Sequence, residues 1–208
     1  MRLLPGILAM AIIVVASNIL VQFLFSQWLT WGAFTYPFAF LVTDLTNRIQ
    51  GAAAARRVVL AGFVVGLICS LIGSQIMGEF GPLVSFRVAL GSGLAFLAAQ
   101  LTDIAVFNRL RARGWWRAPF YSTLAGSALD TAIFFSVAFS SWMVWIEPGN
   151  DVCWANETLP MLGSGPVAPL LTSLAFADWT VKIALAVVAL IPFRVLVGKL
   201  TATPAKNF

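Results

Sequence analysis

The stretch 119-PFYSTLAGSALDTAIFFSVAFSSW-142 is apolar enough to cross a lipid bilayer, and it carries a single acidic residue, Asp130, near its middle. A membrane-spanning helix needs about 20 mostly apolar residues, because a helix rises about 1.5 Å per residue across a hydrocarbon core of about 30 Å. No Lys or Arg lies inside this stretch to neutralise the carboxyl group. Because a charged side chain at mid-membrane costs roughly 2.5–3.5 kcal/mol on insertion scales, such a residue is typical of a solute or ion path.

The rest of the chain repeats this apolar character. Of its 208 residues, 60% are hydrophobic and 10% are charged, whereas about a quarter of the residues of a soluble domain are charged. The stretch 4–25 lacks a cleavage site of the signal-peptide kind, so we expect it to be a retained first helix. We therefore predict an all-α, polytopic membrane protein in which residues 1–208 form a single domain, a bundle of six transmembrane helices. The approximate spans are 4–25, 31–49, 58–77, 83–107, 119–142 and 170–197, with an outer loop at 143–169.

Charge along the sequence predicts the orientation of these spans. Eleven of the thirteen basic residues fall at one set of span ends, namely Arg2, Arg48, Arg56, Arg57, Arg109, Arg111, Arg113, Arg117, Arg194, Lys199 and Lys206. The loops at the other ends hold Glu79, Glu147, Asp151 and Glu157 and no Lys or Arg. By the positive-inside rule both termini are cytoplasmic, which requires an even number of spans. The net charge of +5 thus indicates topology and contact with lipid headgroups, and not a nucleic-acid partner.

Composition also excludes several kinds of membrane enzyme. The chain has no His, which a Ser–His protease, a His-Glu-x-x-His zinc protease and a haem protein with imidazole ligands all require. It has no Walker motif for ATP hydrolysis, and Cys69 and Cys153 have no neighbours to build a metal site, so we expect no cofactor and no metal. An aspartate-dependent intramembrane enzyme is a minor alternative, because the chain lacks the Gly-x-Gly-Asp and Tyr-Asp signatures. These exclusions favour a transporter.

Four acidic residues, Asp44, Asp103, Asp130 and Asp178, lie inside the predicted spans. Asp44 either contributes to a polar cluster or pairs with Arg48 near the cytoplasmic interface, and Asp103 has a similar setting ahead of Asn108 and Arg109. Ser127 and Thr131, beside Asp130, either supply hydroxyl groups to the same site or bond to backbone carbonyls. These alternatives stay open on spacing alone.

Two cations also lie inside the predicted spans. Asp178 and Lys182 have the i, i+4 spacing at which opposite charges meet on one helix face. Lys182 either neutralises Asp178 or is available to a substrate or to Asp130 across the bundle. Arg87, near the outer face, is the other intramembrane cation and could balance one of the carboxylates.

Neutral polar and aromatic side chains complete the candidates. Asn18 and Gln22 share one face of the first span, where they serve either helix contacts or a ligand. The aromatic residues Trp31, Phe34, Tyr36 and Phe38 are typical of an interfacial belt. Small residues from Gly62 to Gly66 permit a homodimer through a small-xxx-small contact.

The motifs that carry a resemblance run along nearly the whole chain. They are 30-TWGAFTYPF-38, Thr43-Asp44-Leu45-Thr46, Gly51, 55-ARR-57, Gln100 with Asp103, 106-VFNRLR-111, Trp115-Trp116-x-Ala118-Pro119, Ser122-Thr123-Leu124, Asp130-Thr131, and Asp178 with Lys182, together with Asn18 and Gln22. In these motifs the chain resembles the queuosine precursor transporter family, also called the vitamin uptake transporter family. It departs from the family in a longer outer loop from residue 147 to residue 169 and at Asn47.

The resemblance implies uptake of a 7-deazaguanine precursor of queuosine, such as 7-cyano- or 7-aminomethyl-7-deazaguanine, across a bacterial inner membrane. Its chemistry suits the residues, because a guanine-like edge offers adjacent N–H donors to a carboxylate and a flat face to aromatic rings. A secondary transporter or facilitator is the first expectation. The alternative is a substrate-binding subunit of an energy-coupling-factor vitamin importer, which would need partner ATPases. The expected partners are a small-molecule substrate and the lipid bilayer.

The resemblance also implies roles for individual residues. Asp130 and Asp178 would read the base edge or couple a proton, while Asp44 and Asp103 would lie nearer the cytoplasm. The substrate-binding candidates are Asn18, Gln22, Phe34, Asp44, Asn47, Gln100, Asp103, Asn108, Asp130, Asp178, Trp179 and Lys182. The candidates for gating or charge balance are Arg48, Arg87 and Arg109.

Overall fold

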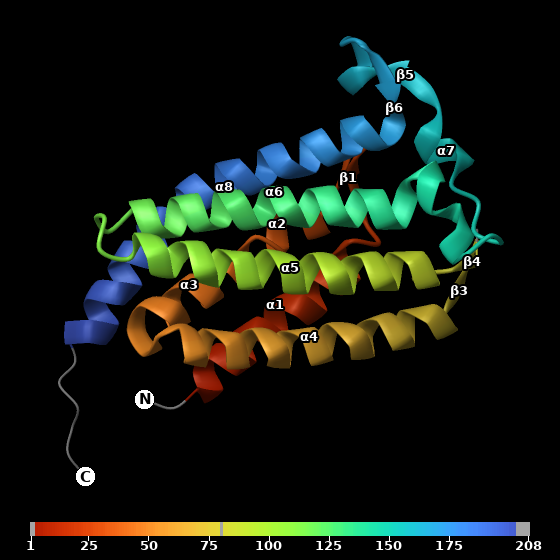
Figure 1. Ribbon diagram of the computed structural model, residues 1–208. Helices are drawn as coiled ribbons and strands as arrows, with labels where there is room; N and C mark the ends of the chain where they lie inside the picture. Colours follow the sequence, from red (N-terminus) through yellow and green to blue (C-terminus); the bar gives the residue numbers. More distant parts are fainter. Residues whose placement is uncertain (1–2, 80, 203–208) are drawn as a thin grey trace.

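The computed structural model describes residues 3–79 and 81–202, and it is a bundle of helices that run side by side (Figure 1). Its α-helices are α1 Leu4–Leu20, α2 Gly32–Thr35, α3 Phe38–Gln50, α4 Ala52–Gln75, α5 Phe86–Leu110, α6 Arg117–Phe139, α7 Cys153–Asn156 and α8 Leu170–Ala202. Two 3₁₀ turns are η1 Ser141–Ile146 and η2 Met161–Gly163. Three antiparallel hairpins pair β1 Leu24–Ser26 with β2 Leu29–Thr30, β3 Met77–Gly78 with β4 Gly81–Pro82, and β5 Thr158–Pro160 with β6 Val167–Pro169.

Among the described residues, four helices are long and apolar enough to cross a membrane: α4, α5, α6 and α8. A fifth apolar helix, α1, is shorter, with 17 residues. Large apolar side chains on the outer faces of these helices are exposed, for example Ile12 on α1, Leu71 on α4 and Ile191 on α8. An apolar exterior around a helical bundle is what a lipid environment requires. The predicted class, a polytopic helical membrane protein, is therefore confirmed.

The predicted span 31–49 is not one helix. It consists of α2 and α3, and the break falls at Tyr36 and Pro37. Pro37 has no N–H to donate to the carbonyl four residues earlier, so a hydrogen bond of the helix is missing here, and Pro37 lies just before the first residue of α3. The prediction of a single continuous helix over 31–49 was wrong for this reason.

The predicted first span, 4–25, is also too long. The helix α1 ends at Leu20, and residues 24–26 form β1, which pairs with β2. The β-branched and aromatic residues from Val21 to Phe25 suit extended backbone, and the N–H of Trp31 donates to the carbonyl of Phe23 at 2.9 Å. The start of α2 then packs directly on the end of α1. Only glycine fits at position 32, because a Cβ there would lie 2.9 Å from the Cα of Val21. The turn after α1 is therefore compact and carries α2 back into the bundle.

Close helix contacts depend on small residues. A Cβ on Gly126 of α6 would lie 2.8 Å from Cε1 of Phe40 and 2.9 Å from the carbonyl oxygen of Ala99 on α5. A Cβ on Gly62 of α4 would lie 2.5 Å from Cγ of Met10 on α1. Close contacts of this kind hold membrane helices together by van der Waals packing, because the hydrophobic effect does not favour helix association within lipid. The helix α6 lies between α5 and α8 in Figure 1, so its two packed faces become the interior of the bundle.

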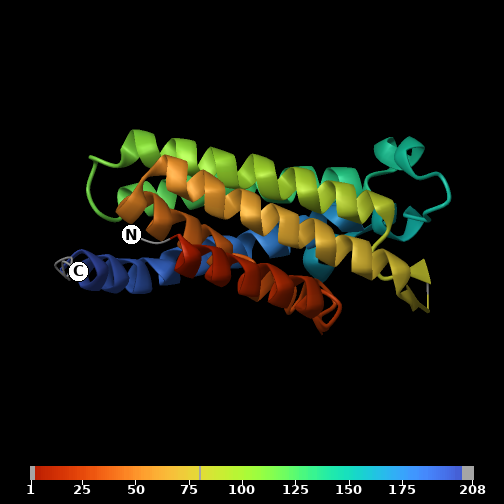
Figure 2. The ribbon, with the colours of Figure 1, turned by 90° about the horizontal axis from the view of Figure 1, so that it is seen from below.

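Charge is segregated between the two ends of the bundle. The α3–α4 turn, the α5–α6 turn, the start of α1 and the end of α8 lie at one end, as both ribbon views show (Figures 1 and 2). Arg48, Arg111 and their basic neighbours fall there, and Nη1 of Arg48 donates to the carbonyl of Arg111 at 3.0 Å. Arg111 in turn donates to the carbonyls of Asn47 and Arg48 at 2.5 and 2.7 Å. Two of the predicted basic positions, Arg2 and Lys206, lie outside the described residues.

The opposite end carries η1, α7 and the hairpin β5–β6, within the loop predicted at 143–169 (Figure 1). This segment is tied to the helix ends. The carboxylate of Glu147 accepts a hydrogen bond from the backbone N–H of Arg87 at 3.0 Å, and Nδ2 of Asn150 donates to Oγ of Ser85 at 2.8 Å. The amide of Asn156 donates to the carbonyl of Phe139 at 2.9 Å. The outer segment thus caps the start of α5 and the end of α6.

We predict that Gly126→Ala destabilises the protein and that Gly198→Ala on α8 does not, since a Cβ at Gly198 meets nothing within 4 Å. The added methyl group at Gly126 would push Phe40 and the α5 backbone apart, and overpacking of this kind costs about 1–3 kcal/mol. Thermal unfolding of both purified variants in the same detergent measures the difference. Equal melting temperatures for the two variants would show that α6 does not need the glycine.

Candidate functional site

The interior of the bundle holds two groups of buried polar side chains. The first, which we call the lysine cluster, consists of Tyr36, Asp130, Thr131, Asp178 and Lys182. The second, which we call the aspartate pair, consists of Asp44 and Asp103 with the hydroxyl groups of Ser122 and Thr123. Both groups include residues of α6. From Ser122 to Asp130 is eight residues, or about 12 Å along a helix.

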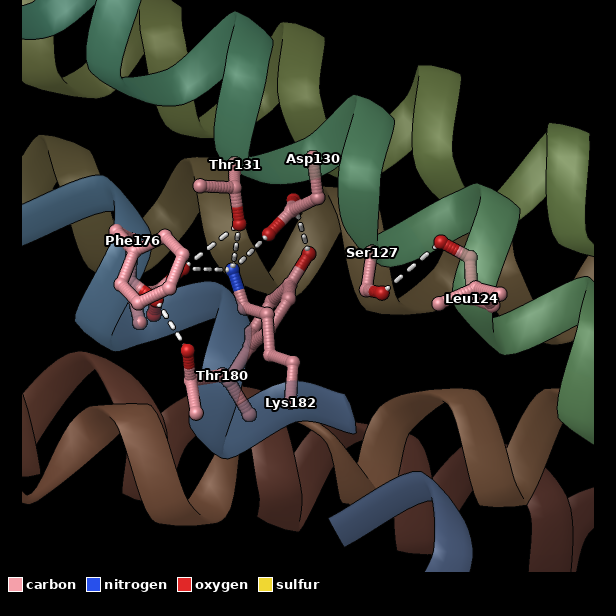
Figure 3. Close-up of polar contacts among 9 residues, drawn as sticks. Leu124, Ser127, Asp130, Thr131, Phe176, Thr180 and Lys182 are labelled. Carbon is pink, nitrogen blue, oxygen red and sulfur yellow. Dashed lines mark hydrogen bonds and ion pairs between the residues drawn. The ribbon is translucent and has the colours of Figure 1, made fainter. Parts of the chain in front are cut away.

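In the lysine cluster, one ammonium group bridges two carboxylates. Nζ of Lys182 lies 2.6 Å from Oδ2 of Asp130 and 2.5 Å from Oδ2 of Asp178, and it also donates to Oγ1 of Thr131 at 3.0 Å. Figure 3 shows Lys182 of α8 reaching toward Asp130 and Thr131 of α6. Oγ1 of Thr131 donates to Asp178 at 2.8 Å. The side chains of Asp130 and Lys182 are 7% and 5% exposed, so this ion-pair network is shielded from water.

The backbone explains how three elements meet here. Asp178 and Lys182 lie one turn apart on α8, and Asp130 and Thr131 lie on the face of α6 that packs against α8. Tyr36 comes from the break between α2 and α3, and its hydroxyl donates to Oδ1 of Asp130 at 3.0 Å. Lys182 also lies over the ring of Tyr36, 5.5 Å from its centroid. Ser127 stays outside this network, because its hydroxyl donates to the carbonyl of Leu124 in its own helix (Figure 3).

The charges in the lysine cluster do not cancel. Two ionised carboxylates face one ammonium group, which leaves a formal charge of −1 inside the bundle. A buried charge needs close partners, because desolvation costs several kcal/mol per ion. The indole of Trp179, the next residue after Asp178, adds an unpaired donor, since its buried Nε1–H donates to no described group. The cluster therefore has both an excess negative charge and a spare N–H donor close by.

The aspartate pair has a different composition. Oδ1 of Asp44 accepts from Oγ of Ser122 at 3.1 Å and Oδ2 accepts from Oγ1 of Thr123 at 3.3 Å. The carboxyl group of Asp103 lies within hydrogen-bonding range of Asp44, yet neither of its oxygens accepts a hydrogen bond from a described residue. Both residues are buried, at 2% and 0% exposure. Neither takes part in either of the two ion pairs found among the described residues.

Two amides beside the aspartate pair are also partly unsatisfied. Oε1 of Gln100 accepts from Thr43 at 2.5 Å, but its Nε2 has no partner among the described residues. Nδ2 of Asn47 donates to the carbonyl of Ile104 at 3.3 Å, and its Oδ1 has no partner there. Buried polar groups are normally paired, so these two amides and the oxygens of Asp103 are exceptions concentrated where α3 meets α5.

Two small cavities lie beside these groups. A cavity of about 10 Å³, close to the space of one water, lies beside Asp44, Thr123 and Phe193 between α3, α6 and α8. A second cavity of about 60 Å³ lies between α1, α4 and α5 and includes Asn18 and Tyr36. Each has room for water molecules, so a larger solute requires the helices to move apart.

Several predicted residues lie away from both groups. Gln22 is exposed beyond the end of α1, and Asn108 is exposed near the end of α5. Phe34 packs on Phe25 and Trp31, with ring centroids 4.9 and 6.0 Å apart, near the outer hairpin. Asn18 donates to the carbonyl of Val14 in its own helix. The structure therefore does not bring Gln22, Asn108 and Phe34 together with the buried acids, whereas Asn18 shares a cavity with Tyr36 of the lysine cluster.

The three predicted balancing cations do not pair with the buried carboxylates in the structure. Arg48 binds the carbonyl of Arg111, and Arg109 is exposed at the end of α5. Arg87 is fully buried, and it donates to the carbonyls of Val137 and Ser140 at 3.1 and 2.6 Å. These carbonyls lie at the end of α6, where no further turn of helix satisfies them, so Arg87 caps α6.

Sequence reasoning missed the role of Tyr36, which was expected in an interfacial belt, and gave no separate role to Ser122 and Thr123. A signal for Tyr36 was present in its neighbour, since a proline directly after a tyrosine inside an apolar span marks a helix break in the membrane. The hydroxyls of Ser122 and Thr123 carry no such signal, because Ser and Thr also bond to their own helix backbone.

Comparison with known proteins identifies the family. The family model described as "Putative vitamin uptake transporter" matches residues 30–197. A "Queuosine precursor transporter" of Escherichia coli (strain K12) is 36% identical over 195 residues, which cover 87% of this chain and 79% of that protein. A "Probable queuosine precursor transporter" of Haemophilus influenzae is 43% identical over 126 residues, 55% of this chain and 54% of that protein.

A further "Probable queuosine precursor transporter", of Bacillus subtilis (strain 168), is 33% identical over 135 residues, 56% of this chain and 58% of that protein. No solved structure matches this chain. Since the family model covers most of the chain and the Escherichia coli relative is matched over more than two thirds of its length, this protein belongs to the vitamin uptake transporter family, and it is a membrane transporter and not an enzyme.

Proposed function

We propose that this protein imports 7-deazaguanine precursors of queuosine, such as 7-cyano- or 7-aminomethyl-7-deazaguanine, across a bacterial inner membrane. The observation that carries the proposal is its 36% identity, over 87% of the chain, to a queuosine precursor transporter. The chain acts as a secondary transporter or facilitator. It has no Walker motif, and its buried charges provide the binding chemistry within one polypeptide.

The proposed topology has six crossings and cytoplasmic termini. Four crossings are α4, α5, α6 and α8, and the other two are α1 and the broken pair α2–α3. The separation of basic from acidic turns supports this orientation, because the basic turns at the α3–α4 and α5–α6 connections would face the cytoplasm. The hairpins and α7 would then face the outside.

The lysine cluster is the proposed base-binding site. A guanine-like edge has two adjacent N–H donors, which a carboxylate accepts together, so Asp130 or Asp178 would bind that edge. The spare Nε1–H of Trp179 would donate to the carbonyl oxygen or to the nitrile of the base. The formal charge of −1 favours the aminomethyl compound further, because its amine is a cation at neutral pH. Asp44 and Asp103 are not part of this proposed site.

Binding at this site requires an exchange of partners. Both oxygens of Asp130 are occupied, one by the Tyr36 hydroxyl and one by Lys182. An incoming base edge would replace these two donors with its own, so the number of hydrogen bonds to Asp130 is kept. Lys182 would stay paired with Asp178 on its own helix, one turn away. Loss of the hydrogen bond between Tyr36 and Asp130 would free the α2–α3 connection from α6. Substrate binding would in this way be coupled to helix movement.

We predict that Asp130→Asn lowers uptake of labelled 7-cyano-7-deazaguanine by about tenfold or more, since a hydrogen bond to a charged group contributes about 1.5–3 kcal/mol. Uptake is measured in cells that neither make nor otherwise import the compound and that express this chain alone. Asp151→Asn, in the outer segment, is the matched control and keeps wild-type uptake. Full uptake by Asp130→Asn would remove the lysine cluster from the binding site. Uptake only in the presence of added ATPase subunits would instead indicate the energy-coupling-factor alternative.

We also predict that Lys182→Met destabilises the protein by about 3–5 kcal/mol, because it leaves two buried carboxylates without a cation. The double variant Asp178→Asn with Lys182→Met removes one of those charges and recovers part of the loss. Thermal unfolding and the fraction of monodisperse protein in detergent measure both effects. Arg113→Met, in the exposed α5–α6 turn, is the control. A Lys182→Met protein as stable as the wild type would show that the bridge is dispensable for folding.

A further inference from the structure

The aspartate pair presents an electrostatic problem that the lysine cluster does not. Asp44 of α3 and Asp103 of α5 are buried, at 2% and 0% exposure, and their carboxyl groups lie within hydrogen-bonding range of each other. Two ionised carboxylates about 4 Å apart repel each other by about 4 kcal/mol at an effective dielectric constant of 20, in addition to their desolvation cost. Some positively charged group must therefore reduce this repulsion.

No side chain of the neighbouring helices supplies that charge among the described residues. On α3 the guanidinium of Arg48 is held by the carbonyl of Arg111, and on α4 Arg56 and Arg57 are exposed. On α6 the hydroxyls of Ser122 and Thr123 face Asp44, and the exposed Arg117 lies over the ring of Trp116. Asp130, further along α6, is bound by Tyr36 and Lys182. On α8, Lys182 is held by Asp130 and Asp178, and the exposed Arg194 lies over the ring of Trp115. Arg109 of α5 is exposed, and residues 4–20 of α1 include no ionisable side chain.

A proton meets the requirement without needing space. An O–H group on one carboxyl group that donates to the other removes one negative charge and satisfies an oxygen that otherwise has no partner. A metal ion would need a shell of oxygen ligands and a volume of its own. The cavity beside Asp44 measures only about 10 Å³, and Asp103 is not among its lining residues.

The hydroxyl contacts distinguish the two carboxyl groups. Asp44 already accepts two hydrogen bonds, from Ser122 and Thr123, and such bonds favour the ionised form of a carboxyl group. Asp103 accepts none from a described residue. The two carboxyl groups thus differ in their partners, and a proton shared between them would reduce their repulsion.

We propose that Asp44 and Asp103 form a proton-binding site that shares one proton in the closed protein, and that this proton is carried inward with each substrate molecule. The first half of the proposal stands on the geometry of the pair, and the second half rests on the proposed transport function. The proton comes from water on the outer side and binds the ionised pair as the helices close around it. It leaves to cytoplasmic water when they separate at the inner end.

The position of the pair makes this release possible. Asp44 lies six residues before the end of α3 and Asp103 seven before the end of α5, both toward the basic end of the bundle. Contacts of Arg111 with the carbonyls of Asn47 and Arg48 hold these two helix ends together. Parting of α3 from α5 at this end would separate the carboxyl groups and admit water, so each would ionise. Because the closed state binds the proton more tightly than the open state, a proton gradient biases the direction of transport.

Infrared spectroscopy of the purified protein in lipid tests proton sharing without any substrate. The wild type and the control Asp151→Asn should show the carbonyl stretch of a buried, protonated carboxyl group near neutral pH, and Asp103→Asn should lose it. The same band in Asp103→Asn, or no such band in the wild type, would overturn the proton-binding site.

Proteoliposomes with an internal pH-sensitive dye test the coupling. With the wild type, net uptake of 7-cyano-7-deazaguanine should acidify the interior and respond to an imposed pH gradient. The Asp103→Asn variant should exchange external labelled substrate for internal unlabelled substrate at the wild-type rate, but it should move no protons. The second variant, Asp44→Asn, should give the same result. Net wild-type uptake without proton movement, or uptake driven by a sodium gradient, would overturn the coupling. No exchange by the wild type would refute the proposed substrate, and the infrared band would still decide whether the pair shares a proton.

Discussion

The structure depends on the ion pairs that Lys182 makes with Asp130 and Asp178 inside a low-dielectric interior. These pairs connect α8 to α6, and the hydroxyl of Tyr36 adds the α2–α3 break to the same point. Van der Waals packing at small residues such as Gly126 sets how closely the helices approach. The ion pairs then determine which faces meet, because a buried carboxylate placed against lipid would have no partner. The apolar faces, by contrast, could slide or rotate at little cost.

The two polar groups of the interior solve the same problem in different ways. In the lysine cluster a side-chain cation compensates two carboxylates, and in the aspartate pair no side chain does so. The cation of the lysine cluster is part of the chain and stays in place while the helices are packed. A proton on the aspartate pair, by contrast, can exchange with water. Residues of α6 take part in both groups, so a movement of this helix would change both together.

The sequence predicted the contacts that lie along one helix better than those that lie between helices. The spacing of Asp178 and Lys182 left two alternatives, a pair on one helix or a lysine available to Asp130, and the structure contains both contacts. For Asp44, a pair with Arg48 was one of two alternatives, but the guanidinium of Arg48 binds the carbonyl of Arg111 and Asp44 joins a polar cluster instead. Arg87 was expected to balance a carboxylate and instead caps the end of α6, because open helix carbonyls also attract a buried cation. Spacing gives the face of a helix, but it does not say which other helix that face meets. Gln22 was predicted on the first helix, but α1 ends at Leu20, so Gln22 lies beyond the helix.

The order of the partners along the chain also affects how the protein enters the membrane. Lys182 follows Asp130 by 52 residues, and the outer segment with α7 and its hairpin lies between them. At about 5–20 residues per second, a ribosome needs several seconds to make that length. During this interval α6 has to stay in the bilayer, or beside the insertion machinery, with Asp130 not yet matched to its lysine. The last helix therefore supplies the ion-pair partner of Asp130, and a chain that stops before α8 would leave this buried carboxyl group without its lysine.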